Sequence, residues 1–214
     1  ALSRSIPTSW EQLWQQLAPS SLVERDAAPW HEGFEASLPI AADLQEISRR
    51  HKNLRRVADK NNVRLIAVTS RAVFPARFNH LADRDNSKGT TLSFLSIELL
   101  HEMLGSLPDG DAQCRFPDAL VTVHGESRPL STYRFEHGGR PVEARFQAGG
   151  EKFLPTALAS MASKYLRELA MRAFNHFWCE RVPNLRPTAG YPVDARRFKR
   201  EIELTQAALG IDDA

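Results

Sequence analysis

A Gly-Tyr-Pro turn at residues 190–192 comes directly before a strongly basic segment that contains Arg196, Arg197, Lys199 and Arg200. An aromatic hydroxyl, a rigid turn and a basic helix side by side suit a nucleic-acid backbone, because lysine and arginine side chains contact phosphates. The same cations are also typical of an ordinary exposed helix face, and Tyr191 of a residue that fills a turn. The local sequence leaves both interpretations open.

A second group of reactive side chains lies upstream of this turn. Glu151 follows Gly149-Gly150, and Lys164 and Arg167 lie three residues apart in a segment rich in alanine and serine. Residues three apart share one face of a helix, and small residues let that helix pack closely on its neighbours. The plainer interpretations are a solvated acid at 151 and an ordinary ion pair between Lys164 and Glu168.

Taken in order, these segments resemble the type 2 ribonucleases H, including the type 3 branch. In that family a strand ends in a metal-binding acid, a helix of the form A-A-S-x-x-A-K-x-x-R-[D/E] follows, and a G-Y-P or G-Y-G turn comes later. The corresponding stretches here are Glu151, "ALASMASKYLRE" at residues 157–168 and "GYP" at residues 190–192. The resemblance covers residues 149–202 and extends more loosely to residues 63–104, where "RFN" lies at residues 77–79.

The resemblance implies a role for each matched residue. Glu151 would be a catalytic acid, the last of four carboxylates that hold two Mg²⁺ or Mn²⁺ ions, and hard oxygen ligands suit such ions. Tyr191, with Gly190, would contact the 2′-hydroxyl that distinguishes RNA from DNA. Lys164 and Arg167 would position phosphates, and further phosphate contacts would come from Arg196, Arg197 and Lys199.

The activity implied by the resemblance is endonucleolytic cleavage of RNA in RNA–DNA hybrids or ribonucleotide-containing duplexes. However, the chain has no Asp-Glu dipeptide, whereas the family's first acids lie in a D-E-x-G strand. Asp109, Asp111 and Asp118 do not follow an apolar run, so none takes the place of the central-strand Asp. Because one carboxylate cannot hold two ions, the sequence leaves two interpretations: an incomplete copy of an active enzyme, or a non-catalytic nucleic-acid-binding or scaffold protein of the same fold.

The elements that would position these residues follow from hydrophobic periodicity and turn signals. Thr8 and Glu11 predict a capping box ahead of a helix with Trp10, Leu13, Trp14 and Leu17 on one face. Further helices are predicted over residues 40–60, 74–81, 92–103, 156–180 and 193–209, strands over residues 63–68 and 119–125, and a hairpin over residues 133–146. Residues 19–39 are expected to be irregular.

These elements, with the resemblance, predict an α/β fold: an incomplete, ribonuclease H-like mixed sheet flanked by helices. Residues 1–62 would form a helical extension and residues 63–214 the α/β domain, the two joined as one continuous domain.

Composition limits the partners and the compartment. The net charge is only +2, but residues 151–200 carry ten Lys/Arg against four Asp/Glu, so an anionic partner is expected to bind this third of the chain. Two cysteines favour a reducing, cytoplasmic compartment over a disulfide framework. No apolar run approaches the ~20 residues that span a bilayer, so no membrane partner is expected.

Overall fold

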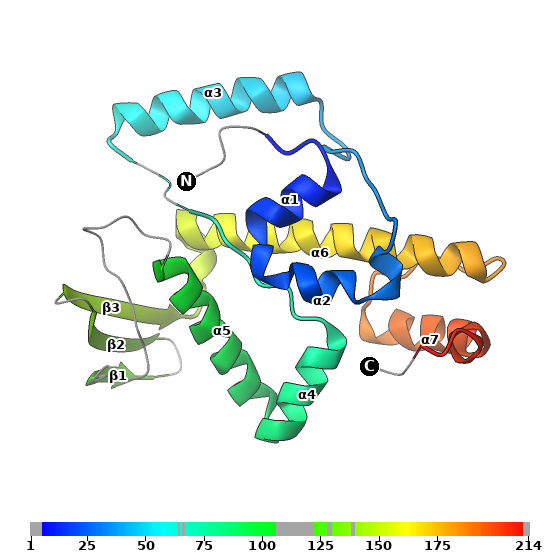
Figure 1. Cartoon of the computed structure of the whole chain (residues 1–214). Helices are drawn as coiled ribbons and strands as arrows, with labels where there is room; N and C mark the ends of the chain where they lie inside the picture. Colours follow the sequence, from blue (N-terminus) through cyan, green and yellow to red (C-terminus); the bar gives the residue numbers. More distant parts are fainter. Residues whose placement is uncertain are drawn as a thin grey trace.

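The computed structural model describes residues 6–63, 65, 67–105, 122–127, 130–137 and 140–211 of the chain (Figure 1). Its helices are α1 (Trp10–Leu17), α2 (Leu22–Asp26), α3 (Leu44–Lys60), α4 (Pro75–Asp85), α5 (Lys88–Gly105), α6 (Leu154–Arg181) and α7 (Pro192–Ala208). Short 3-10 helices are η1 (Pro19–Ser21), η2 (Pro29–His31) and η3 (Gly150–Lys152), and the strands are β1 (Thr122–Glu126), β2 (Leu130–His137) and β3 (Arg140–Gln147). None of the described helices is both long and apolar enough to cross a bilayer.

The predicted mixed α/β sheet flanked by helices is wrong, because the described residues are mainly helical. The three described strands pair only with one another, in the antiparallel order β1-β2-β3. The hairpin predicted at residues 133–146 is confirmed, since Arg134 lies opposite Glu143 and His137 opposite Arg140, while its turn at residues 138–139 lies outside the described residues. This meander is local in sequence and provides no central sheet for the helices to cover.

The predicted strand at residues 63–68 is also wrong. Val63 donates its backbone N–H to the Ala58 carbonyl at 2.9 Å, which closes the end of α3 rather than a ladder. Val63 is 58% exposed and Leu65 is 38% exposed, so these residues are not in the core. An apolar run of this length is compatible with a connecting segment as well as with a strand, and here no described strand lies beside it.

The central element is α6, against which α1 packs. Trp10, Leu13 and Trp14 lie on one face of α1, and each is nearly or fully buried. They form one core cluster with Leu169 of α6, and the other members of the cluster are Ala18, Leu38, Leu166 and Ala173. The first helix therefore shares its core with α6, and residues 10–38 are not an appendage to a separate domain.

The cap of α1 lies one residue later than predicted. Ser9, not Thr8, is the N-cap, and its hydroxyl accepts a hydrogen bond from the Gln12 N–H at 3.3 Å. The Gln12 side-chain oxygen accepts from the Thr8 N–H at 2.9 Å, so a glutamine three residues after the cap replaces the predicted Glu11. Glu11 instead forms an ion pair with the buried Arg25 of α2, at 2.7 Å.

Buried serines join the segment before α4 to the N-terminal helices. The Ser21 hydroxyl donates to the Ala72 carbonyl at 3.1 Å and accepts from the Ala72 N–H at 3.0 Å. The Ser70 N–H donates to the Leu17 carbonyl at 2.6 Å. These bonds satisfy backbone groups that no sheet satisfies, and they hold residues 70–72 beside α1 and η1.

Charged side chains connect α2, α4 and α5. Arg77 of α4, part of the "RFN" segment, contacts Glu24 at 2.7 Å and Glu98 at 2.9 Å. Arg71 reaches Glu98 at 3.9 Å and Glu102 at 3.5 Å. All five side chains are partly buried, so solvent screens this network less than it screens exposed pairs. These ion pairs give the Arg77 side chain a structural role.

The second core cluster joins the C-terminal half of α6 to α7. Trp178 of α6 and Phe198 and Ile202 of α7 are almost fully buried, and Leu185 completes the cluster. Gly210 has φ +64° just beyond α7, the left-handed conformation typical of a residue that ends a helix. The helices predicted at residues 156–180 and 193–209 are therefore confirmed within a few residues.

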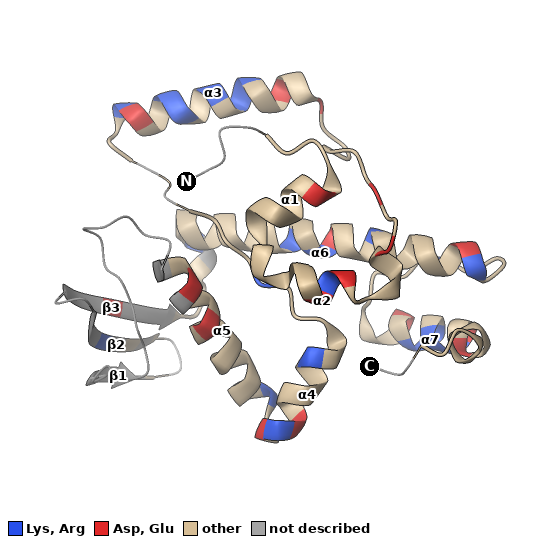
Figure 2. Cartoon of the chain, in the orientation of Figure 1, with Lys and Arg blue, Asp and Glu red and all other residues tan. Residues whose placement is uncertain are grey.

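Helix α3 differs from the others because it buries none of its residues. Figure 2 shows cationic residues along much of its length, and Leu54 and Val57 are also exposed, at 64% and 50%. Asp43 caps the helix by accepting from the Gln45 N–H at 3.1 Å, and Glu46 pairs with Arg49 and Arg50. Capping and these ion pairs support the helix locally.

We expect Leu169→Ala to lower the free energy of unfolding by about 2–5 kcal/mol, because it leaves a cavity in the centre of the core. Leu169 is 0% exposed. The matched control is Leu54→Ala on exposed α3, which should change stability by no more than about 0.5 kcal/mol. Urea unfolding measures both, and equal effects would contradict the assignment of the core.

His31 makes stability depend on pH. Burial, and then the charge of Arg25, lowers the pKa of His31 from 6.5 to about 4. Between these two pH values His31 is protonated in the unfolded chain but neutral in the folded chain. The contribution of His31 to the free energy of unfolding is therefore complete above pH 6.5 and is lost as the pH falls from 6.5 to about 4. His31→Phe should remove a stability difference of roughly 2–3 kcal/mol between pH 7 and pH 4.

The measurement is urea unfolding of the wild type and His31→Phe at several pH values in this range. The exposed His80 carries the control substitution, His80→Phe, which should leave the wild-type pH profile in place. If His31→Phe keeps the full wild-type loss of stability, His31 is not its source.

Candidate nucleic-acid interface

The loop between α6 and α7 is held by side chains from both helices. Asn175 of α6 donates its amide to the Thr188 carbonyl and accepts from the Thr188 N–H, both at 2.8 Å. This pair of bonds satisfies the backbone of a buried residue and fixes the loop one residue before Ala189.

The Thr188 hydroxyl then organises the Gly-Tyr-Pro turn. It accepts from the Gly190 N–H at 3.0 Å and donates to the Asp194 carboxylate in the first turn of α7. The hydrogen bond from Thr188, and next that from Arg197, holds the pKa of Asp194 below its usual range. Since a carboxyl with a lowered pKa stabilises the fold above its ordinary pKa, this contribution is lost as the pH falls toward acid.

The structure brings three of the four predicted substrate-binding residues together. The Arg167 guanidinium lies 5.6 Å from the centre of the Tyr191 ring and donates to the Ala189 carbonyl at 2.5 Å. Gly190 has φ +74°, and a Cβ added there would lie 3.4 Å from the Arg167 guanidinium. The positive φ favours glycine here, whereas a Cβ would make only an ordinary van der Waals contact with Arg167. Tyr191 is 66% exposed, so its hydroxyl is available to a ligand.

The fourth residue, Lys164, is exposed one turn before Arg167 on the same helix face. Arg196 is exposed on α7, as expected of a phosphate contact. Lys199 instead donates to Gln206 at 2.8 Å. These three cations, with Arg167, remain the side chains on which phosphate binding could be tested.

Arg197 has a structural role in this loop. It pairs with Asp194 at 2.8 Å and with Glu201 at 2.6 Å, and it donates to the Arg186 carbonyl at 3.1 Å. Its side chain is only 20% exposed. The N–H donors of the Arg197 guanidinium are therefore mostly engaged around the loop that carries the Gly-Tyr-Pro turn. Few of them remain to bind a phosphate.

Glu151 lies far from this group along the helix. Its backbone belongs to η3, just before α6 begins, and its side chain lies outside what the structure describes. From Leu154 to Arg167, α6 rises about 20 Å. At 3.4 Å for each nucleotide, this separation corresponds to about six steps along a strand. The backbone geometry therefore does not bring Glu151 and Tyr191 to the same phosphate.

The described residues do not fit a two-metal site. They contain no group of three or more His, Cys, Asp or Glu side chains that could hold an ion. Beside the turn, Asp194 is bound by Thr188 and Arg197, and Glu168 is paired with Arg167 at 3.1 Å. Asp109, Asp111 and Asp118 lie outside the described residues. No catalytic step through a metal follows from this geometry.

The sequence prediction missed the residues that build the turn: Asn175, Thr188 and Asp194. A signal for Asp194 was present, because an acid in the first turn of a helix after Pro192 is typical of a helix start. Asn175 carried no such signal, because its partner Thr188 lies in the loop beyond the end of α6. The two residues meet only because that loop folds back on the helix.

Comparison with known proteins adds no assignment: no family model, no curated protein and no solved structure matches this chain.

We expect Thr188→Val to destabilise the protein by about 1–3 kcal/mol, because it leaves the Gly190 N–H without its acceptor. The same change should raise the pKa of Asp194 toward its usual range, because the largest cause of the lowered value is removed. Thr188→Ser keeps the hydroxyl and should preserve the pKa. Urea unfolding and NMR titration of the Asp194 carboxyl measure both effects, and equal pKa values in the two variants would contradict this role.

Proposed function

We propose that this chain binds duplexes that contain RNA, with Tyr191 at a ribose 2′-hydroxyl and the nearby cations at the adjacent phosphates. The single observation that carries the proposal is the assembly of Tyr191, Arg167 and Gly190 from two segments distant in sequence. The Tyr191 ring is stacked under a guanidinium at 5.6 Å, while most of the side chain is exposed. A fixed phenol beside cations suits a sugar–phosphate backbone, and the 2′-hydroxyl is both donor and acceptor.

The turn itself supports close approach of a backbone. Gly190 carries no side chain, and its conformation is fixed through Thr188 and Arg167. Lys164 lies one turn away along α6, where its side chain is exposed. A nucleic-acid strand that runs along α6 would therefore contact the Lys164 ammonium group and then the Tyr191 phenol.

Metal-dependent cleavage of the RNA strand, with Mg²⁺ or Mn²⁺, is the second candidate. It is favoured by the order of Glu151, the Lys164–Arg167 helix and the Gly-Tyr-Pro turn, which resembles that of type 2 ribonucleases H. The described acidic side chains do not form the set of ligands that two metal ions need. Binding of RNA-containing duplexes is therefore the first proposal, and hydrolysis is tested separately.

The test compares a fluorescein-labelled RNA–DNA hybrid with a DNA duplex of the same sequence, by anisotropy at low salt with EDTA. We expect tighter binding to the hybrid. Tyr191→Phe should weaken hybrid binding by about 2–10-fold, the range for one hydrogen bond, and leave DNA binding unchanged. Tyr165→Phe on α6, outside the turn, is the matched control. Lys164→Gln should lower the salt dependence by about one phosphate contact on both duplexes.

Absence of hybrid binding at low salt would reject the proposed function. Equal losses on hybrid and DNA in Tyr191→Phe would reject the ribose contact while leaving general binding intact. Adding Mg²⁺ or Mn²⁺ to the bound hybrid then separates the two candidates. An RNA product that disappears in Glu151→Gln supports hydrolysis, whereas binding without product supports the non-catalytic interpretation.

A further inference from the structure

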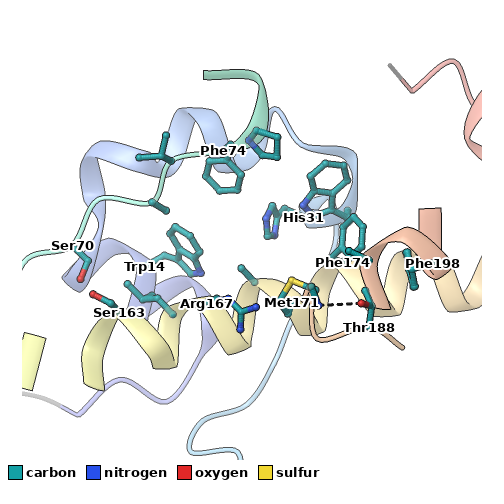
Figure 3. Close-up of a pocket in the computed structure, with 18 of the residues that line it drawn as sticks. Trp14, His31, Ser70, Phe74, Ser163, Arg167, Met171, Phe174, Thr188 and Phe198 are labelled. Atoms are coloured by element: carbon teal, nitrogen blue, oxygen red, sulfur yellow. Dashed lines mark hydrogen bonds between the residues drawn. The ribbon is translucent and has the colours of Figure 1, made fainter. Parts of the chain in front are cut away.

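A cavity of about 570 Å³ lies between α1, η2, residues 70–75, α6 and α7 (Figure 3). Ligand sites for small organic molecules range over about 300–1,000 Å³ and are mainly apolar. Six aromatic side chains line this one: Trp14, Trp30, His31, Phe74, Phe174 and Phe198. Binding of a ligand in this cavity is independent of the RNA binding proposed above.

The aromatic side chains are arranged as in sites for flat rings. Trp14 and Phe74 are stacked with ring centres 6.2 Å apart, and Trp30 and Phe174 meet edge to face with ring centres 5.3 Å apart. Phe198 continues the series, 5.4 Å from Phe174. Stacked and edge-on contacts are the preferred geometries between aromatic rings, so this wall favours a flat aromatic body over a branched aliphatic one.

Two buried side chains of the cavity wall have polar atoms with no hydrogen-bond partner. Both ring nitrogens of His31 and the indole nitrogen of Trp14 are buried and unpaired in the described structure. His31 is 6% exposed and Trp14 is 1% exposed. Figure 3 shows the His31 ring projecting between Phe74 and Met171. A buried polar atom without a partner is costly, so a ligand atom that bonds one of these groups would be favoured.

The charge at the cavity is positive. Arg167, Arg71 and Lys199 are among its lining residues, and no Asp or Glu is among them in the described part of the chain. Arg71 is compensated by Glu98 and Glu102, whereas the contact of Arg167 with a carboxylate is to the exposed Glu168. An apolar wall with a cation at its edge complements a ligand that has an apolar body and one anionic group.

We propose that this cavity binds a flat aromatic compound with one anionic group, its rings among the six aromatic side chains and its anion at Arg167. Ala170 and Met171 of α6 also line this cavity. Arg167 touches both this cavity and the Gly-Tyr-Pro turn, but the two ligands are distinct and can be measured separately.

The experiment uses two probes with the same ring system, without nucleic acid present: 1-anilinonaphthalene-8-sulfonate and the neutral N-phenyl-1-naphthylamine. Fluorescence titration should give one site for the sulfonate. Arg167→Gln should weaken sulfonate binding fivefold or more and change binding of the neutral amine less than twofold. Ala170→Phe fills the cavity and should remove binding of both probes, whereas Ala159→Phe, on the same helix but outside the cavity, should bind both like the wild type.

The proposal is overturned by sulfonate binding that Ala170→Phe leaves intact in a folded protein, or by equal losses of both probes in Arg167→Gln. Circular dichroism establishes that each variant is folded. If Ala170→Phe does not fold, the Arg167→Gln comparison decides alone, because the Arg167 side chain is 43% exposed and its replacement leaves the core in place.

Discussion

Burial of the Trp14 indole against α6 is the constraint on which the rest of this structure depends. The helix is long, and one face of it must be covered by residues from the distant N-terminal segment. Once α1 covers that face, Ser70 and Ser21 hold the segment before α4 beside it. The position of α2, α4 and α5 then follows, because Arg77 joins them through its two carboxylate partners.

The same helix sets the functional geometry. Its C-terminal half, through Asn175, fixes Thr188 and so the Gly-Tyr-Pro turn, while its middle presents Arg167 to Tyr191. A rigid helix keeps these contacts in register, and its rise of about 20 Å from Leu154 to Arg167 separates them from the end of α6 that follows Glu151. This separation agrees better with the proposed recognition of a duplex than with a compact catalytic centre.

Local patterns in the sequence predicted the longer helices and the hairpin, since their apolar spacing and turn residues are short-range signals. The expectation that residues 19–39 are irregular was wrong, because α2 and two 3-10 helices lie there. The face of Trp10, Leu13 and Trp14 is an example, although its cap was placed one residue early. The sheet was predicted wrongly because the apolar run at residues 63–68 carries no information about which strand would lie beside it. The proximity of Arg167 to Tyr191 was anticipated only through a family resemblance. The Asn175–Thr188 bonds, which create that proximity, depend on tertiary structure.

Helix α3 is attached to the rest of the molecule in an unusual way, because it contributes no residue to either core cluster. In proteins most of the stability of a helix comes from packing of its apolar face, because nucleation of an isolated helix is costly. Its opening therefore need not disturb α1 or α6. We therefore expect the 17 residues of α3 to unfold as a local unit, so that their amides exchange with solvent without global unfolding, whereas those of α6 exchange only through global unfolding.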